Sequence, residues 1–204
     1  MSRKGRIIAI EGIDAVGKHT QSLLLQTWFR DHGCRAESLS FPVYGTPIGK
    51  EIKAFLKDSQ RFGAEVRHML FAANRWEKLS LIKQLLTENE VVIVNRYTES
   101  NLAYGLANGL RLKWLVALEE GIPRSDLVVV LDPRSESLTS RRGGARDSYE
   151  KNRGLQLRVQ EIYKELAPRF GWIVVDGSKT VESVHRSIVR VVKANLDAGL
   201  RAKL

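Results

Sequence analysis

Residues 12–20, Gly-Ile-Asp-Ala-Val-Gly-Lys-His-Thr, follow the apolar run Ile7-Ile8-Ala9-Ile10 after a single residue, Glu11. The run predicts a buried strand, and the residues after Gly17 predict a helix. Glycines let successive backbone N–H groups turn inward, and the helix N-terminus adds positive charge, so this arrangement suits a phosphate group. The spacing G-x-x-x-x-G-K fits the P-loop, in which Lys18 would reach the outer phosphates. The alternative is a glycine-rich turn with a chance lysine, but the flanking strand and helix favour phosphate binding.

Length and composition indicate one globular domain. The chain has 204 residues, of which 43% are hydrophobic and 27% charged; this predicts a single domain, residues 1–204, with a substantial core. No apolar run approaches the ~20 residues of a membrane span, and the basic N-terminus runs straight into the first strand, unlike a secretory signal. The single cysteine, Cys34, excludes an intramolecular disulfide and suits a reducing cytoplasm. We expect Cys34 to be buried.

The net charge of +10 is the unusual feature of the composition. It suits a polyanionic ligand, which could be a nucleoside phosphate or a nucleic acid. The basic residues are spread along the chain, and no signature of a DNA- or RNA-binding module is present. Nucleic acid is therefore the less favoured partner.

Hydrophobic periodicity predicts alternating strands and helices. Strands are expected after the first one at 35–41, 91–94, 127–131 and 173–175, and a loop at 43–50. Helices are expected at 18–30, 48–56, 64–87 (as one or two), 98–108, 111–120, 149–167 and 181–195. This order predicts a three-layer α/β fold, a five-stranded parallel sheet with helices on both faces. Ligands bind at the carboxyl ends of such strands, where the sequence places Asp14, Asn95, Arg96 and Asp132.

Several segments in the same order resemble the thymidylate kinase family of P-loop nucleoside monophosphate kinases. Besides the P-loop, they are Phe41-Pro42 with 44–49, the stretch 70–77, Asn95-Arg96-Tyr97 with the helix behind it, and Val175-Asp176-Gly177-Ser178. The resemblance covers nearly the whole chain. It implies Mg²⁺-dependent transfer of the γ-phosphoryl group of ATP to dTMP, giving dTDP for dTTP biosynthesis. Such chemistry depends mainly on positioning two nucleotides in line and neutralising charge.

The resemblance assigns roles to individual residues. The expected ATP-binding residues are Gly12, Ala15, Val16, Gly17, Lys18, His19 and Thr20. Lys18, Arg96 and Asp14 would be catalytic, with Arg96 on the acceptor phosphate and Asp14 near the 3′-hydroxyl. The expected substrate-binding residues are Asp14, Phe41, Tyr44, Phe71, Arg75, Arg96, Ser100, Asn101, Tyr104 and Glu150.

Within that set, Phe71 would stack on thymine and Arg75 would donate to a base-edge oxygen. Their spacing of four residues puts both on one helical face, which favours the base over simple core packing for Phe71. For Trp76 we expect core packing. Asn101 and Tyr104 would border the sugar and disfavour a ribose.

A basic segment at about 138–150 is expected to close over ATP as a lid. The P-loop has Ala15 and Val16 where one subgroup of the family has an arginine. Arg141, Arg142 and Arg146 are therefore the expected catalytic arginines, beside two glycines that would let the segment move. A solvated basic loop is the alternative.

The chain departs from the family at the positions expected to support magnesium binding. His19 replaces the loop Ser or Thr, and Asn95 replaces the aspartate at the end of the third strand. Loss of such a support weakens metal binding by about 10–100-fold, so Asp14 and Asp132 are candidate replacement ligands. Val43-Tyr44 stands where many relatives have an arginine. These changes leave two alternatives open: a kinase of another nucleoside monophosphate, or a weakly active nucleotide-binding paralogue.

The resemblance also implies a cytoplasmic homodimer, paired through helices in 64–86 and 102–118. His32, His68 and His185 have no metal-ligand spacing, and we expect them at the surface.

Overall fold

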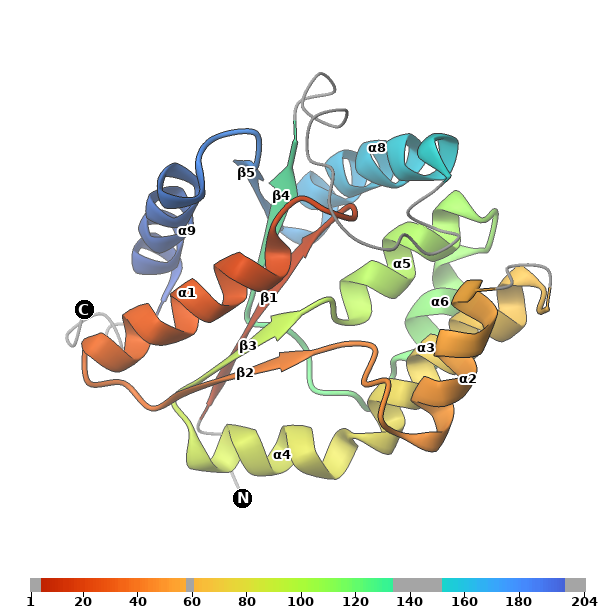
Figure 1. The fold of residues 1–204 in the computed structure, drawn as a ribbon, viewed down its shortest axis with the longest axis horizontal. Helices are drawn as coiled ribbons and strands as arrows, with labels where there is room; N and C mark the ends of the chain where they lie inside the picture. The colour runs from red at the N-terminus through yellow and green to blue at the C-terminus, as the bar shows by residue number, and fades with distance from the viewer. Residues whose placement is uncertain (1–4, 58–60, 134–151, 197–204) are drawn as a thin grey trace.

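The computed structural model describes residues 5–57, 61–133 and 152–196. At its centre lies a five-stranded parallel sheet with the strand order β2-β3-β1-β4-β5 (Figure 1). The strands are β1 (Arg6–Gly12), β2 (Ala36–Ser40), β3 (Val91–Asn95), β4 (Leu127–Asp132) and β5 (Ile173–Asp176). The sheet confirms the predicted α/β fold.

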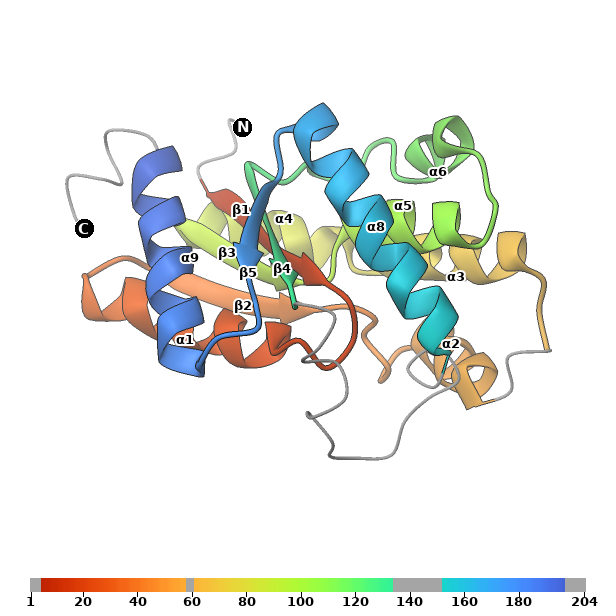
Figure 2. The ribbon, with the colours of Figure 1, turned by 90° about the horizontal axis from the view of Figure 1, so that it is seen from above.

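Helices cover both faces of the sheet (Figures 1 and 2). On one face α1 (Lys18–Asp31) packs against α9 (Val181–Asn195). The other face carries α4 (Leu79–Glu88), α5 (Thr98–Ala107) and α8 (Arg153–Phe170). Beyond the carboxyl ends of β2 and β3 lie α2 (Pro47–Lys57), α3 (Ala64–Glu77) and α6 (Leu112–Leu118).

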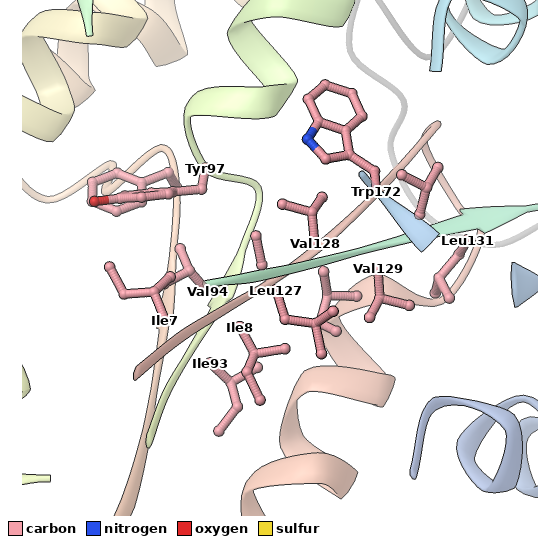
Figure 3. Packing of buried hydrophobic residues seen from close by; sticks show 14 of the residues in the cluster. Ile7, Ile8, Ile93, Val94, Tyr97, Leu127, Val128, Val129, Leu131 and Trp172 are labelled. Atoms are coloured by element: carbon pink, nitrogen blue, oxygen red, sulfur yellow. The ribbon is translucent and has the colours of Figure 1, made fainter. Parts of the chain in front are cut away.

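The central strands are apolar at nearly every position because both of their faces are covered. Ile7–Ile10 and Val91–Val94 have no exposed surface. Figure 3 shows side chains of β1, β3 and β4 packed in this core, among them Ile8, Ile93 and Val129. Cys34 belongs to the same core, as predicted.

The register of the sheet brings the ends of three strands together. Asn95, the last residue of β3, pairs with Ile10 of β1 on one side and with Ser40 of β2 on the other. Gly12 pairs with Leu131 of β4. The loops that follow β1, β2 and β3 therefore start side by side.

Some element boundaries differ from the predicted ones. The span 64–87 is two helices, which break at Lys78. The predicted loop 43–50 is shorter, since α2 already begins at Pro47, a residue whose fixed φ suits the first helical turn. The helix predicted at 149–167 is described from Arg153 and continues to Phe170, with Pro168 in its last turn, before the left-handed Gly171 ends it.

None of the helices in the described part of the chain is both long and apolar enough to cross a membrane.

Candidate active site

The P-loop connects β1 to α1 and has the backbone geometry that its glycines permit. Gly12 has a φ of 133°, and a Cβ there would lie 2.5 Å from the carbonyl oxygen of Leu131. Gly17, with a φ of 97°, precedes α1 and brings no capping side chain. The first N–H groups of an uncapped helix are natural donors to an anion.

Lys18 is the first residue of α1 and folds back over this loop. Only 7% of its surface is exposed, and its Nζ donates to the carbonyl oxygen of Ile13 at 2.6 Å. Its ammonium group thus lies above the loop that would hold the phosphates. His19 and Thr20 follow on the exposed surface of the same helical turn.

A cavity of about 390 Å³ opens beside the P-loop, within the size range of small-molecule sites. Its walls come from the loops after β1, β2 and β3 and from α3 and α5. They include nine predicted substrate-binding residues: Asp14, Phe41, Tyr44, Phe71, Arg75, Arg96, Ser100, Asn101 and Tyr104. His19 and Asn95 line it as well. Residues far apart in the sequence thus form one site.

Near the P-loop, the cavity wall is built around Arg96. This residue has a φ of 61°, a left-handed conformation that costs free energy outside glycine and occurs mainly at functional sites. Its Nη2 donates to Asp14 Oδ1 and, at 3.1 Å, to the hydroxyl of Tyr104, while Nη1 donates to Ser100 Oγ at 3.3 Å. The guanidinium also lies over the Tyr104 ring, 5.0 Å from its centroid.

Asp14 is ionised by this environment. It accepts hydrogen bonds from Gln156 Nε2 at 2.7 Å and from the Tyr104 hydroxyl at 3.1 Å. Burial opposes the charged form, but the positive charges of Arg96 and Lys18, with these hydrogen bonds, lower the pKa of Asp14 from 3.8 to about 2. Asp14 in turn raises the pKa of Arg96, against the effect of burial.

The far end of the cavity is formed by α3. Phe71 is half-buried, and its ring meets the edge of Phe55 at 5.4 Å between centroids. Arg75, one helical turn on, is only 3% exposed and forms a two-pronged ion pair with Glu119, in which Nε donates to Oε2 at 2.9 Å and Nη2 donates to Oε1. An aromatic face beside a fixed guanidinium can bind a flat ring that carries acceptor oxygens.

A family model described as thymidylate kinase matches residues 10–188. The chain belongs to the thymidylate kinase family. The thymidylate kinase of Schizosaccharomyces pombe is 37% identical over 196 residues, covering 93% of this chain and 92% of that protein. The human thymidylate kinase is 35% identical over 190 residues, covering 92% and 89%.

An archaeal relative, the probable thymidylate kinase of Thermococcus gammatolerans, is 38% identical over 208 residues, covering 96% of this chain and all of that protein. Among solved structures, the thymidylate kinase of Candida albicans, described as having broad substrate specificity, superimposes with a TM-score of 0.84 at 29% identity. The match covers 96% of this chain and 94% of the other.

Three of the four residues considered for magnesium line the cavity: Asp14, His19 and Asn95. Asn95 donates from Nδ2 to Ser40 Oγ at 3.3 Å, and its Oδ1 is buried without a hydrogen-bond partner among the described residues. A buried acceptor without a partner fits a hard cation, as does the carboxylate of Asp14. No group of three His, Cys, Asp or Glu side chains suited to a metal exists in the described ranges. A magnesium ion here would thus need phosphate oxygens and water in addition to Asp14 and Asn95.

Asp132, the other candidate carboxylate, has protein partners. Its Oδ1 accepts from Gln160 Nε2 at 2.6 Å, and its Oδ2 pairs with Lys164 Nζ at 3.1 Å. Asp132 does not line the cavity. Asp14 is therefore the better-placed of the two carboxylates.

The predicted lid lies outside the described residues. Arg141, Arg142, Arg146 and Glu150 all belong to this part of the chain, as does the segment 138–150 as a whole.

Sequence reasoning missed Glu11, which has no exposed surface. Its carboxylate accepts from the backbone N–H of Tyr97 at 2.7 Å, from Ser100 Oγ at 2.5 Å and from the Tyr163 hydroxyl at 2.7 Å. Glu11 therefore fixes the start of α5, which carries the partners of Arg96. The signal was a carboxylate at the end of an apolar strand, directly before Gly12.

Glu119 was missed as well, because it ends a helix 44 residues after its partner Arg75. No local pattern connects the two.

Two expectations about individual side chains were wrong. His68 is not at the surface: it is fully buried and hydrogen-bonded to α5. Trp76 is not a core residue, since 43% of its surface is exposed; its Nε1 donates to the carbonyl oxygen of Leu118, and its ring lies against Gly121. His32 and His185 are partly exposed. In each wrong case polar partners on another helix decided the orientation.

Proposed function

We propose that this chain transfers the γ-phosphoryl group of ATP to dTMP and forms dTDP. One observation carries the proposal: a single cavity runs from Asp14 at the P-loop to Phe71 and Arg75 on α3. A nucleotide lying along it would have its phosphate beside the P-loop and its base at the aromatic end. Membership of the thymidylate kinase family supports thymine as that base.

The donor side is the P-loop. The β- and γ-phosphates of ATP would lie over the backbone N–H groups from Ala15 to Thr20, with the Lys18 ammonium above them. Gly12 and Gly17 are needed for the loop's curvature, as their positive φ values indicate. Val16 and His19 complete the ATP-binding set.

The acceptor phosphate would bind Arg96. Arginine presents five N–H donors in a planar fork, so it can hold a phosphate while it keeps some of its bonds to Asp14, Tyr104 and Ser100. Asp14 and Tyr104 then border the sugar. Asn101 lies behind them with its amide bonded to His68 and Glu119, so we assign it a supporting role.

The base would stack on Phe71, with a base-edge oxygen accepting from Arg75. Glu119 orients Arg75 and offsets its charge in a buried site. Phe41 and Tyr44 close the cavity from the side of β2.

Mg²⁺ would be held by phosphate oxygens, water, Asp14 and the Oδ1 atom of Asn95. The ion supplies charge neutralisation on the migrating group. The segment 138–150 is proposed as a lid that brings Arg141, Arg142 or Arg146 to the ATP phosphates, with Glu150 orienting them. We treat residues 1–204 as one nucleotide kinase domain, which acts in the cytoplasm.

The chain is also proposed to form a homodimer through α3 and α6, which contact each other. The support is apolar exposure on adjacent helices: Val66, Met69 and Trp76 on α3 and Val116 on α6 are each 38–43% exposed. Large apolar side chains that gather on one face of a protein are typical of a protein interface.

A coupled assay that measures ADP formation tests the activity. Wild-type protein with ATP and Mg²⁺ should turn over dTMP with a higher kcat/KM than dUMP, dGMP or thymidine. Thymidine lacks the phosphate that Arg96 would bind, and dGMP carries a larger purine base in place of thymine. A preference for thymidine or dGMP over dTMP would contradict the proposal.

A further inference from the structure

His68 lies on α3 at the base end of the cavity, and the proposed reaction gives it no direct part. The side chain is fully buried, and its ring centroid lies 5.9 Å from that of Phe71. The ring nitrogens face Asn101 of α5 and Asn108, the residue that directly follows this helix. Nδ1 lies 2.6 Å from Asn101 Oδ1, and Nε2 lies 3.3 Å from Asn108 Nδ2.

The partners of the ring define its tautomer. Asn101 Nδ2 donates to the carboxylate of Glu119 at 2.8 Å, and a carboxylate is an acceptor only, so the orientation of this amide is determined. Its Oδ1 therefore accepts, and Nδ1 of His68 must carry the proton. Asn108 Nδ2 donates to the carbonyl oxygen of Tyr104 at 2.7 Å, which leaves its second N–H for Nε2 of the ring. Both asparagines specify the same neutral imidazole.

We propose that His68 is a positioning residue for the base of the acceptor nucleotide, because its Nδ1–H form orients Asn101, which orients Glu119, which holds Arg75. The inference rests on the proposed function, in which Arg75 contacts the base. The chain of contacts is continuous from the ring to the guanidinium: His68 to Asn101, Asn101 to Glu119 Oε1, and Glu119 to both Nε and Nη2 of Arg75.

Burial, together with the charges around the ring, keeps it neutral. Burial lowers the pKa of His68 from 6.5 to about 4; the hydrogen bond with Asn101 opposes this shift, and the positive charges of Arg67 and Arg75 add to it. Glu119, at the end of α6, is the anion of the cluster, and it is bonded to Arg75 and Asn101. The side chains that face the ring nitrogens from α5 and its C-cap are two neutral amides, those of Asn101 and Asn108. A protonated ring would set a donor against Asn108 Nδ2.

A merely structural role and a positioning role make different predictions for substrate binding. A structural residue lowers stability and affects both substrates alike. A residue that positions Arg75 affects dTMP, whose base Arg75 contacts, and leaves ATP unaffected, since ATP would bind at the other end of the site.

The test uses three variants of the full chain. His68→Leu keeps a similar volume without any donor. His68→Asn places an amide N–H near the position of Nδ1 and so restores the bond to Asn101. Ile82→Ala is the matched control, because Ile82 is fully buried in α4 and does not line the cavity.

Calorimetric dTMP binding, KM for each substrate, kcat and Tm are measured for each variant. We expect His68→Leu to weaken dTMP binding at least tenfold, with kcat and the KM for ATP within threefold of wild type. His68→Asn should bind dTMP within threefold of wild type, and Ile82→Ala should lower Tm without weakening dTMP. A ¹⁵N spectrum of the histidine rings, assigned with His68→Asn, should show the Nδ1–H tautomer in wild-type protein at neutral pH.

The outcomes distinguish failure of the His68 inference from failure of the proposed function. Failure of wild-type protein to bind dTMP overturns both. Wild-type binding of dTMP with an Nε2–H ring, or with His68→Leu unaffected, overturns the inference alone. So does an equal rise of both KM values in His68→Leu. The ¹⁵N spectrum of wild-type protein tests the predicted Nδ1–H tautomer even if His68→Leu does not fold.

Discussion

Arg96 donates a hydrogen bond from Nη2 to Asp14 Oδ1, and this ion pair joins the loop after β1 to the loop after β3. Both side chains are less than a quarter exposed, so the pair lies in a poorly solvated site. Each partner keeps the other charged: Arg96 lowers the pKa of Asp14, and Asp14 raises the pKa of Arg96. The two residues proposed to meet the acceptor phosphate and the sugar are thus oriented before any nucleotide binds.

Replacing Arg96 by lysine should lower kcat/KM for dTMP by about 10² or more, since lysine keeps the charge but loses the planar fork that binds Asp14, Ser100 and phosphate together. Steady-state kinetics with varied dTMP measures the effect. The KM for ATP, which binds the P-loop, serves as the internal control. An Arg96→Lys enzyme within threefold of wild type would show that the guanidinium does not bind the acceptor.

Replacing Asn95 by aspartate should strengthen magnesium binding by about tenfold or more, because a carboxylate returns a full negative charge to the position of the orphaned Oδ1. Ser40 Oγ can donate to the new carboxylate, so the local hydrogen bond is conserved in reverse. Calorimetric titration of Mg²⁺ into protein with dTMP and a non-hydrolysable ATP analogue measures the affinity directly.

The same variant separates an enzyme with a weakened metal site from a nucleotide-binding protein without catalysis. An enzyme should gain turnover at low Mg²⁺ as its metal affinity rises. Unchanged Mg²⁺ affinity and turnover in Asn95→Asp would show that residue 95 does not contact the ion. Asn95→Ala is the matched control, since it removes the oxygen without adding charge.

Replacing Met69 by aspartate should shift the protein from dimer to monomer, because a charge placed in an apolar interface must be desolvated without a partner. Light scattering after size-exclusion chromatography reports the mass. Val174→Asp is the control: Val174 is similarly exposed, at 41%, but lies on the edge strand β5, away from α3 and α6. A wild-type monomer, or a Met69→Asp dimer, would contradict the proposed interface.

The free energy of unfolding should fall as the pH drops from about 6.5 to about 4, and His68 is one cause. In the unfolded chain its pKa is near 6.5, whereas burial in the folded chain lowers it to about 4. Between these values the unfolded state binds the extra proton, so acid favours unfolding. A difference of this size corresponds to about 3 kcal/mol at 1.36 kcal/mol per pKa unit.

Urea unfolding at a series of pH values checks this dependence. Arg67, Arg75 and Glu119 are the charged groups near the ring. His68→Asn should reduce the loss of stability between pH 6.5 and 4, whereas His185→Asn, on the distant helix α9, should leave most of it. An unchanged pH profile in His68→Asn would contradict the buried neutral state of the ring.

The order of elements and the P-loop were predictable because their signals are local. An apolar run of β-branched residues such as Val91–Val94 favours a strand covered on both faces, and Gly12 and Gly17 at their spacing indicate the loop between a strand and a helix. The cavity residues Phe71 and Arg75 were predictable from their helical spacing together with the family resemblance. The spacing and periodicity arguments need only neighbours within a few residues.

By itself, then, the sequence determined where strands and helices lie along the chain, where the phosphate loop is, and which side chains stand at the strand ends. Periodicity and backbone freedom are properties of short segments. The partners of those side chains were decided by the tertiary structure alone. The burial of His68, the exposure of Trp76, the bond from Glu119 to Arg75 and the pairing of Asp14 with Arg96 all depend on which helices pack together. Hydrogen bonds in a poorly solvated site form wherever the fold brings donor and acceptor within about 3 Å, whatever their separation along the chain.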